Sequence, residues 1–113
     1  MKNEAYSIVV VATDSHKSWE INTEFKSGMK LKGALNDVED IADALDDASD
    51  SHSRTTKGNQ DWQITVTQIK GMIIIEKRSS QHTEAAELAP PVAKQLAADL
   101  REEHRKAWAI LKP

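Results

Sequence analysis

Alternation of apolar and polar residues is strongest between Trp62 and Arg78. The first half of this stretch places its apolar residues two apart, on one face of a β-strand: Trp62, Ile64 and Val66. Gly71 then interrupts the pattern and suits a tight turn. Met72–Ile75 is apolar at every position. We therefore predict a β-hairpin whose second strand is covered on both faces, by helices or by another subunit.

Two further strands are predicted near the start of the chain. Tyr6–Thr13 has apolar residues on both faces, which indicates a central strand, whereas Trp19–Lys26 alternates strictly and has one solvated face. Met29–Lys32 fits either a short third strand or the approach to a helix. Trp19–Met29 and Trp62–Met72 share Trp, Ile, Gly and Met at equivalent positions. This match allows a duplicated strand–turn unit, although shared strand chemistry is the simpler explanation.

Helical spacing of apolar residues appears in two segments. The first helix starts at Asn36, which can act as its N-cap, and its apolar stripe contains Leu35, Val38, Ile41, Ala42, Leu45 and Ala48. The last helix spans Pro91–Leu111, with a proline suited to the first turn. Ser49–Asp61 has no apolar residue and is predicted to be a surface loop. Thr83–Leu88 is predicted to form a short helical turn.

These elements predict an α+β fold for residues 1–113 as one domain. Their order is ββαββα, or βββαββα if Met29–Lys32 pairs. An antiparallel sheet of four, possibly five, strands with both helices on one face satisfies this order. We expect the large core anchors to be Trp19, Trp62 and Trp108.

Charge is concentrated in the first helix. Seven acids and no base occur in one stretch, and they form the candidate partner-binding site: Asp37, Glu39, Asp40, Asp43, Asp46, Asp47 and Asp50. The remainder of the chain has a net charge of +4, with fifteen bases and eleven acids. Acids three or four residues apart on a helix repel each other, and a basic partner would relieve this repulsion. The helix is therefore a solvated surface, a docking face for a basic protein, or a mimic of nucleic acid.

Catalytic signatures are lacking. The sequence has no cysteine, no phosphate-binding glycine loop and no nucleophile elbow. His16, His52 and His82 fall in predicted loops without metal-ligand spacing, and His104 falls on the apolar face of the last helix. We predict that the protein is not an enzyme and has no cofactor and no metal site.

Hydropathy and the positions of the basic residues bear on membrane, nucleic-acid and self-association partners. No stretch is apolar enough to span a membrane and no signal peptide is evident, so we expect a cytoplasmic protein without membrane contact. Nucleic-acid binding is the alternative function, through the bases of the hairpin and the last helix: Lys70, Lys77, Arg78, Arg101, Arg105 and Lys106. The apolar run Met72–Ile75 also allows a homodimer.

The stretches YSIVVVATDSHKSWEINTEFK and WQITVTQIKGMIIIEK, together with the acidic helix, resemble the short uncharacterised proteins of lambdoid prophages of enteric bacteria. The resemblance covers most of the chain and implies a cytoplasmic accessory protein of phage origin. It implies no activity and no functional residues. The leading hypothesis is a non-enzymatic protein that binds another protein, one with a basic surface, through its acidic helix.

Overall fold

The first three strands of the chain form an antiparallel sheet. The computed structural model describes residues 4–12, 19–51, 54–58 and 62–111. The strand order is β1 (Tyr6–Ala12), β2 (Trp19–Phe25) and β3 (Lys30–Ala34). One face of this sheet is buried and contributes Tyr6, Ile8, Ile21, Phe25 and Leu31 to the core. The alternating pattern of β2 therefore places Ile21 and Phe25 inside, as predicted.

The second sheet has four antiparallel strands, in the order β4 (Thr55–Gly58), β5 (Trp62–Ile69), β6 (Met72–Ser79) and β7 (Thr83–Leu88). β5 and β6 form the predicted hairpin, with Ile69 paired to Met72 across a two-residue turn. Lys70 has a φ of 52° and Gly71 has a φ of 81°, and positive φ at both positions is the pattern of a type I′ turn.

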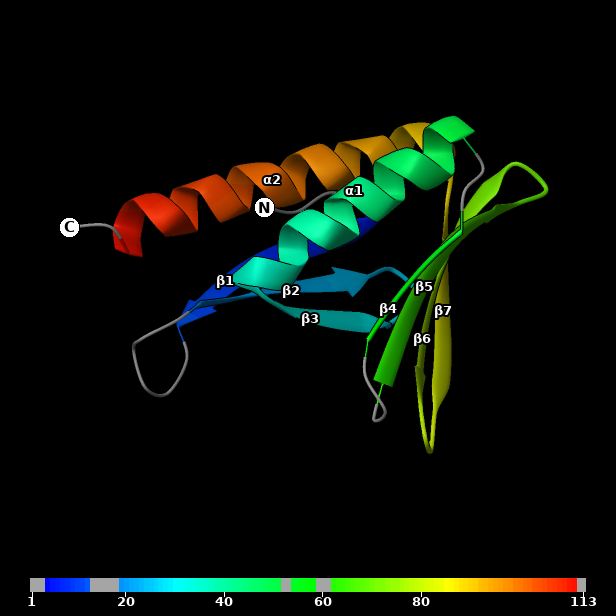
Figure 1. Cartoon of the computed structure of the whole chain (residues 1–113), viewed down its shortest axis with the longest axis horizontal. Helices are drawn as coiled ribbons and strands as arrows, with labels where there is room; N and C mark the ends of the chain where they lie inside the picture. Colours follow the sequence, from blue (N-terminus) through cyan, green and yellow to red (C-terminus); the bar gives the residue numbers. More distant parts are fainter. Residues whose placement is uncertain (1–3, 13–18, 52–53, 59–61, 112–113) are drawn as a thin grey trace.

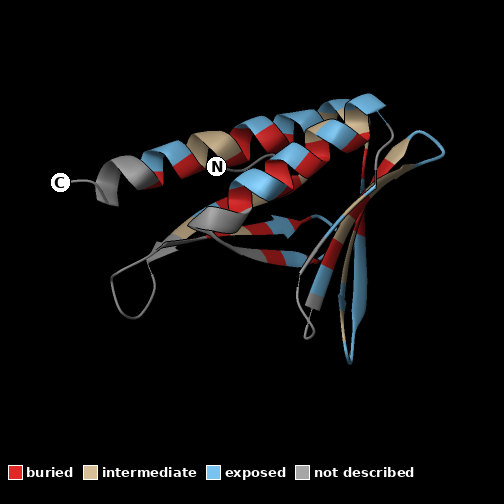
Figure 2. Ribbon diagram, viewed as in Figure 1, coloured by how far each residue is buried: buried red, intermediate tan, exposed pale blue. Residues whose placement is uncertain are grey.

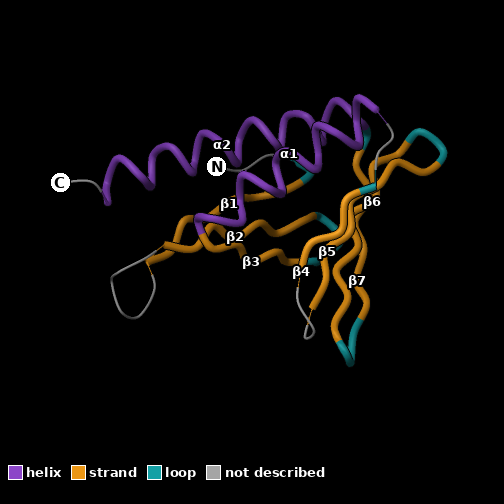
Figure 3. The backbone as a smooth tube through the Cα atoms, in the orientation of Figure 1, coloured by secondary structure: helices purple, strands orange, loops and turns teal. Residues whose placement is uncertain are grey.

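Two antiparallel helices lie side by side over one face of the three-stranded sheet (Figure 1). They are α1 (Leu35–Ser51) and α2 (Pro90–Leu111). The four-stranded sheet stands steeply at one end of this two-layer unit, where β5 and β6 also contact α1 (Figure 3). Buried residues line the surfaces on which the helices and the two sheets meet (Figure 2).

The α+β class, the antiparallel strands and the two helices are confirmed. One sheet has four strands, as predicted, but the described residues form a second sheet of three strands, which makes seven strands in two sheets instead of four or five in one. The additional strands are β4, inside the predicted loop Ser49–Asp61, and β7, where a helical turn was predicted. Met29–Lys32 overlaps β3, which settles its ambiguity in favour of a strand.

Three local predictions are also corrected. β1 is an edge strand, and Val9 on its second apolar face is 56% exposed. β6 is fully buried on only one face, because Ile73 and Ile75 are inaccessible while Met72 and Ile74 are half-buried. The first helix starts at Leu35, so Asn36 lies inside it instead of capping it. The side chains of the three tryptophans lie outside the described residues.

Side-chain hydrogen bonds connect the four-stranded sheet to the rest of the molecule. Gln68 Nε2 on β5 donates to the carbonyl oxygen of Ala48 at 2.9 Å, near the end of α1. The last carbonyl groups of a helix have no intrahelical partner, so this amide acts as a cap from another element. Lys77 Nζ on β6 donates to the carbonyl oxygen of Lys30 on β3 at 3.0 Å. The first contact thus joins the four-stranded sheet to α1, and the second joins it to the three-stranded sheet.

Candidate partner-binding surface

The candidate surface is the acidic helix α1, and the structure divides its acids by the direction in which they face. Four acids contact α2 and lie at helical spacing along one stripe of α1: Glu39, Asp43, Asp46 and Asp50. Asp40 and Asp47 are exposed and seven residues apart, so they share a different face. The side chain of Asp37 lies outside the described residues.

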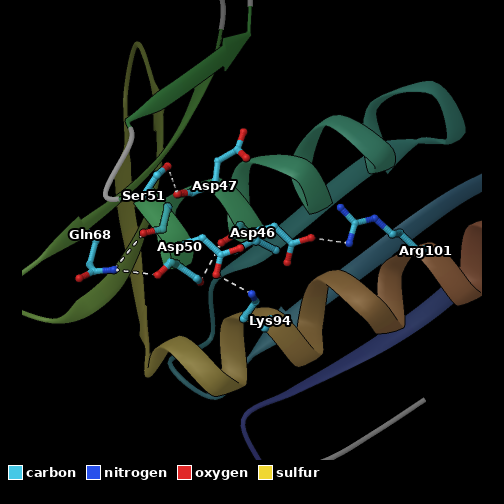
Figure 4. Close-up of polar contacts among 10 residues, drawn as sticks. Asp46, Asp47, Asp50, Ser51, Gln68, Lys94 and Arg101 are labelled. Atoms are coloured by element: carbon cyan, nitrogen blue, oxygen red, sulfur yellow. Dashed lines mark hydrogen bonds and ion pairs between the residues drawn. The ribbon is translucent and has the colours of Figure 1, made fainter.

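Arg101 on α2 bridges two of these carboxylates. Its Nη1 donates to Asp46 Oδ2 at 2.6 Å (Figure 4). Its Nη2 donates to Asp43 Oδ1 at 2.7 Å. The hydrogen bonds to Asp43 and Asp46 raise the pKa of Arg101 above its usual value. One guanidinium group thus offsets the repulsion between two acids three residues apart on α1.

Two further contacts join the acidic stripe to α2. Lys94 Nζ forms an ion pair with Asp50, and this hydrogen bond raises the pKa of Lys94 (Figure 4). His104 Nδ1 lies 3.6 Å from Glu39 Oε1, and His104 itself is buried. The interpretation of His104 as a residue of the inner face of the last helix is thereby confirmed.

The carboxylates on this stripe remain accessible although they are paired. The side chain of Asp43 is 65% exposed, whereas that of Asp46 is 29% exposed. Arg101 contacts one oxygen of each carboxylate, and an ionised carboxylate can accept about four hydrogen bonds. Asp43 therefore keeps an oxygen that can accept a hydrogen bond from a basic partner.

Asp47 lies on the side of α1 that faces away from these contacts (Figure 4). It is exposed, and its carboxylate has no ion pair within the described part of the chain. Near the same end, the hydroxyl groups of Ser49 and Ser51 donate to the carbonyl oxygens of Leu45 and Asp47 at 2.8 Å. The C-terminal end of α1 thus has hydrogen bonds from its own serines in addition to the ion pair between Asp50 and Lys94 of α2.

The bases of the alternative, nucleic-acid-binding surface are mostly engaged within the chain. Arg78 pairs with Glu76, Arg105 with Glu102, and Lys106 with Glu103. The hydrogen bond between Arg105 and Glu102 raises the pKa of Arg105 and lowers the pKa of Glu102. Lys70 lies at the β5–β6 turn, distant in the fold from the bases of α2. The six bases therefore do not form one continuous positive surface.

No group of three or more His, Asp or Glu side chains within the described residues could hold a metal ion. His82 is exposed in the β6–β7 turn, and His16 and His52 lie outside the described residues. No helix in the described ranges is long and apolar enough to cross a membrane.

Comparisons with known proteins add no family. No protein-family model, no curated protein and no solved structure matches the chain.

Sequence reasoning identified the acids but missed the residues of α2 that hold them. Arg101 and Asp43 are separated by 58 positions, and pattern spacing within one helix carries no information about such a pair. The same holds for the buried hydrogen bond from Tyr6 on β1 to Asp99 on α2. The available signal was indirect: a helix with seven acids required nearby positive charge.

Proposed function

We propose that this chain is a non-enzymatic binding protein that docks a basic surface of another protein on helix α1. The single observation that supports the proposal is a helical layer with a large excess of negative charge, much of it on exposed side chains of α1. Helices α1 and α2 together contain ten acids and four bases, while the rest of the chain contains eight acids and eleven bases. A layer with this excess attracts a positive surface and accelerates encounter with it.

The ion pairs with α2 favour this use of the helix. They hold Asp43 and Asp50 in defined positions while leaving both side chains mostly exposed. A partner's lysine or arginine then loses less conformational freedom in reaching them than it would with mobile carboxylates. Nucleic-acid binding, the alternative, is less well supported because five of the six bases already contact groups of the chain.

The test uses exposed acids of α1 whose loss leaves the bridge from Arg101 intact. Neutralising Asp43 or Asp46 would release Arg101 and disturb the contact between the helices, so these residues make poor probes. We therefore choose the double variant Asp47→Asn with Asp50→Asn, because the exposed ion pair of Asp50 with Lys94 contributes little to stability. The matched control is Glu24→Gln with Glu84→Gln, which removes two exposed acids from strands. Tagged wild-type protein and both variants are used in pull-downs from bacterial lysate, with and without nuclease.

The proposal predicts a protein that is retained by wild type and by the strand control, lost with the helix variant, and unaffected by nuclease. Its retention should also weaken as salt rises, since exposed charges are screened. Capture that survives the helix substitutions contradicts the proposal. Capture that disappears with nuclease would instead favour the alternative function, and an empty pull-down would leave α1 as a solvated surface.

A further inference from the structure

The outer face of the four-stranded sheet carries apolar residues that no element of the described chain covers (Figure 1). Ile69 on β5 is 52% exposed. Its neighbours Met72 and Ile74 on β6 are half-buried, whereas Ile73 and Ile75 on the opposite face are inaccessible. A strand with apolar residues on both faces is typical of a sheet that is covered on both sides.

The strand register places one row of four side chains across this outer face. Thr67 pairs with Ile74, and Ile74 pairs with Glu87. Thr55 pairs with Val66, so the preceding residue, Arg54, lies next to Thr67. The row therefore reads, from one edge of the sheet to the other, Arg54, Thr67, Ile74 and Glu87.

The two ends of this row carry opposite charges. Arg54 and Glu87 are both exposed, and neither has an ion pair in the described part of the chain. They are separated by the two central strands, so they do not neutralise each other directly. The row is thus positive at the β4 edge, apolar at its centre, and negative at the β7 edge.

A hollow of about 220 Å³ lies on the same face. It is centred on β5, and its lining residues are Arg54, Thr65, Thr67, Ile69, Ile74 and Glu76. Thr65, Thr67 and Ile69 belong to β5, whereas Ile74 and Glu76 belong to β6. A branched apolar side chain from an opposing surface would fit into this space.

We propose that this face binds a second copy of the chain, with a two-fold axis in the interface parallel to the strands. Such an axis places β6 of each copy over β5 of the other, and each β4 edge over the other β7 edge. Ile74 of each copy then enters the hollow above Thr67 of the other. Arg54 of each copy faces Glu87 of the other at both ends of the row.

The reciprocal arrangement favours a second copy over an unrelated protein. One operation brings each Arg54 opposite Glu87 and each Ile74 opposite the hollow at the same time, as an isologous interface requires. Strand spacing and rise give a face of about 19 Å by about 27 Å, or about 500 Å². This area is below the ~800 Å² per partner of a typical stable interface, so we expect a reversible dimer with a micromolar dissociation constant.

The test is sedimentation equilibrium of the purified full chain over micromolar to millimolar concentrations. Arg54→Glu alone and Glu87→Arg alone each place like charges opposite each other at both ends, and each should weaken dimerisation by at least about tenfold. An equimolar mixture of these two variants restores both attractive contacts in a heterodimer. We expect the mixture to recover an affinity within about threefold of wild type.

Glu84→Arg is the matched control, because Glu84 also lies on β7. It is three residues from Glu87 and opposite Lys77 in the strand register, so it is on the other face of the sheet. This substitution should leave the dimer unchanged. A wild-type chain that stays monomeric at millimolar concentration overturns the proposal, as would be found if this face were reserved for a different protein. Single charge reversals without effect, or a mixture that fails to associate, overturn it equally. None of these residues lies on α1, so the result is independent of the proposed docking function.

Discussion

At the scale of single residues, the Tyr6–Asp99 contact has the clearest energetic role. Tyr6 Oη donates to Asp99 Oδ2 at 2.6 Å, and Gln95 Nε2 donates to Asp99 Oδ1 at 2.8 Å. Tyr6 is only 2% exposed and Asp99 is 8% exposed, so water cannot readily replace a lost partner. The contact joins the first strand to the last helix and satisfies a carboxyl group that would be costly to bury alone.

We predict that Tyr6→Phe lowers the free energy of unfolding by about 1–3 kcal/mol, because it leaves one oxygen of the buried Asp99 without its donor. Urea denaturation measures the change, with an unaltered m-value as evidence that the folded state keeps its compactness. Adding Asp99→Leu to Tyr6→Phe removes the orphaned carboxyl group and should recover part of the loss. An equal loss from Tyr6→Phe and from the double variant would contradict the assigned cause, because the double variant has no orphaned carboxyl group and both variants keep the aromatic ring.

At the scale of elements, the strands that sequence pattern revealed are those with a buried alternating face. β2 and β5 bury every second residue in their clearest stretches, so their periodicity was visible. β4 and β7 were missed because β4 has no large apolar residue, and Thr83–Leu88 is rich in glutamate and alanine, which favour helices. Both are edge strands whose conformation comes from pairing with β5 and β6.

The hairpin turn between β5 and β6 provides a test at this scale. Lys70 has a positive φ, which is unfavourable for a residue with a Cβ atom, and Asn-Gly is the preferred pair in such turns. We predict that Lys70→Asn raises the free energy of unfolding by about 0.5 kcal/mol. Gly71→Ala should lower it by about 1–2 kcal/mol, although nothing lies within 4 Å of the added Cβ, because the strain is in the backbone itself.

Thermal unfolding of Lys70→Asn, Gly71→Ala and Gly28→Ala measures these changes and compares the two turns. Gly28 has a φ of 95° and equally open surroundings, so it tests the same backbone cost in the other sheet. Similar losses for both alanine variants would support a purely conformational origin. Stabilisation by Gly71→Ala, or destabilisation by Lys70→Asn, would contradict the assigned turn.

At the scale of the whole molecule, the two halves of the chain have related arrangements. Trp19–Met29 and Trp62–Met72, which share residues at equivalent positions, each form a strand and a turn that contains a glycine with positive φ. Each sheet is followed by a helix, and the two helices pack against each other. The division into two sheets could not be foreseen, because strand periodicity identifies faces and not which strands are neighbours.

The ion pairs between α1 and α2 join these two halves and offer a final prediction. Arg101→Met removes the bridge to Asp43 and Asp46 and leaves their mutual repulsion unopposed. We expect the free energy of unfolding to fall by up to about 1 kcal/mol at low salt, a modest loss because water screens exposed pairs. Arg105→Met is the matched control, since Arg105 pairs with Glu102 on its own helix and does not connect the halves.

Salt distinguishes this electrostatic contribution from packing of the long arginine side chain. In 1 M NaCl the screening length falls to about 3 Å, so the stability difference between wild type and Arg101→Met should shrink there. Urea unfolding at low and high salt measures both values. A difference that persists unchanged in 1 M NaCl would mean that the aliphatic part of Arg101 holds the helices together. In that case the acids of α1 would owe their positions to the helix alone, and the argument that α2 preorders them for a basic partner would fail.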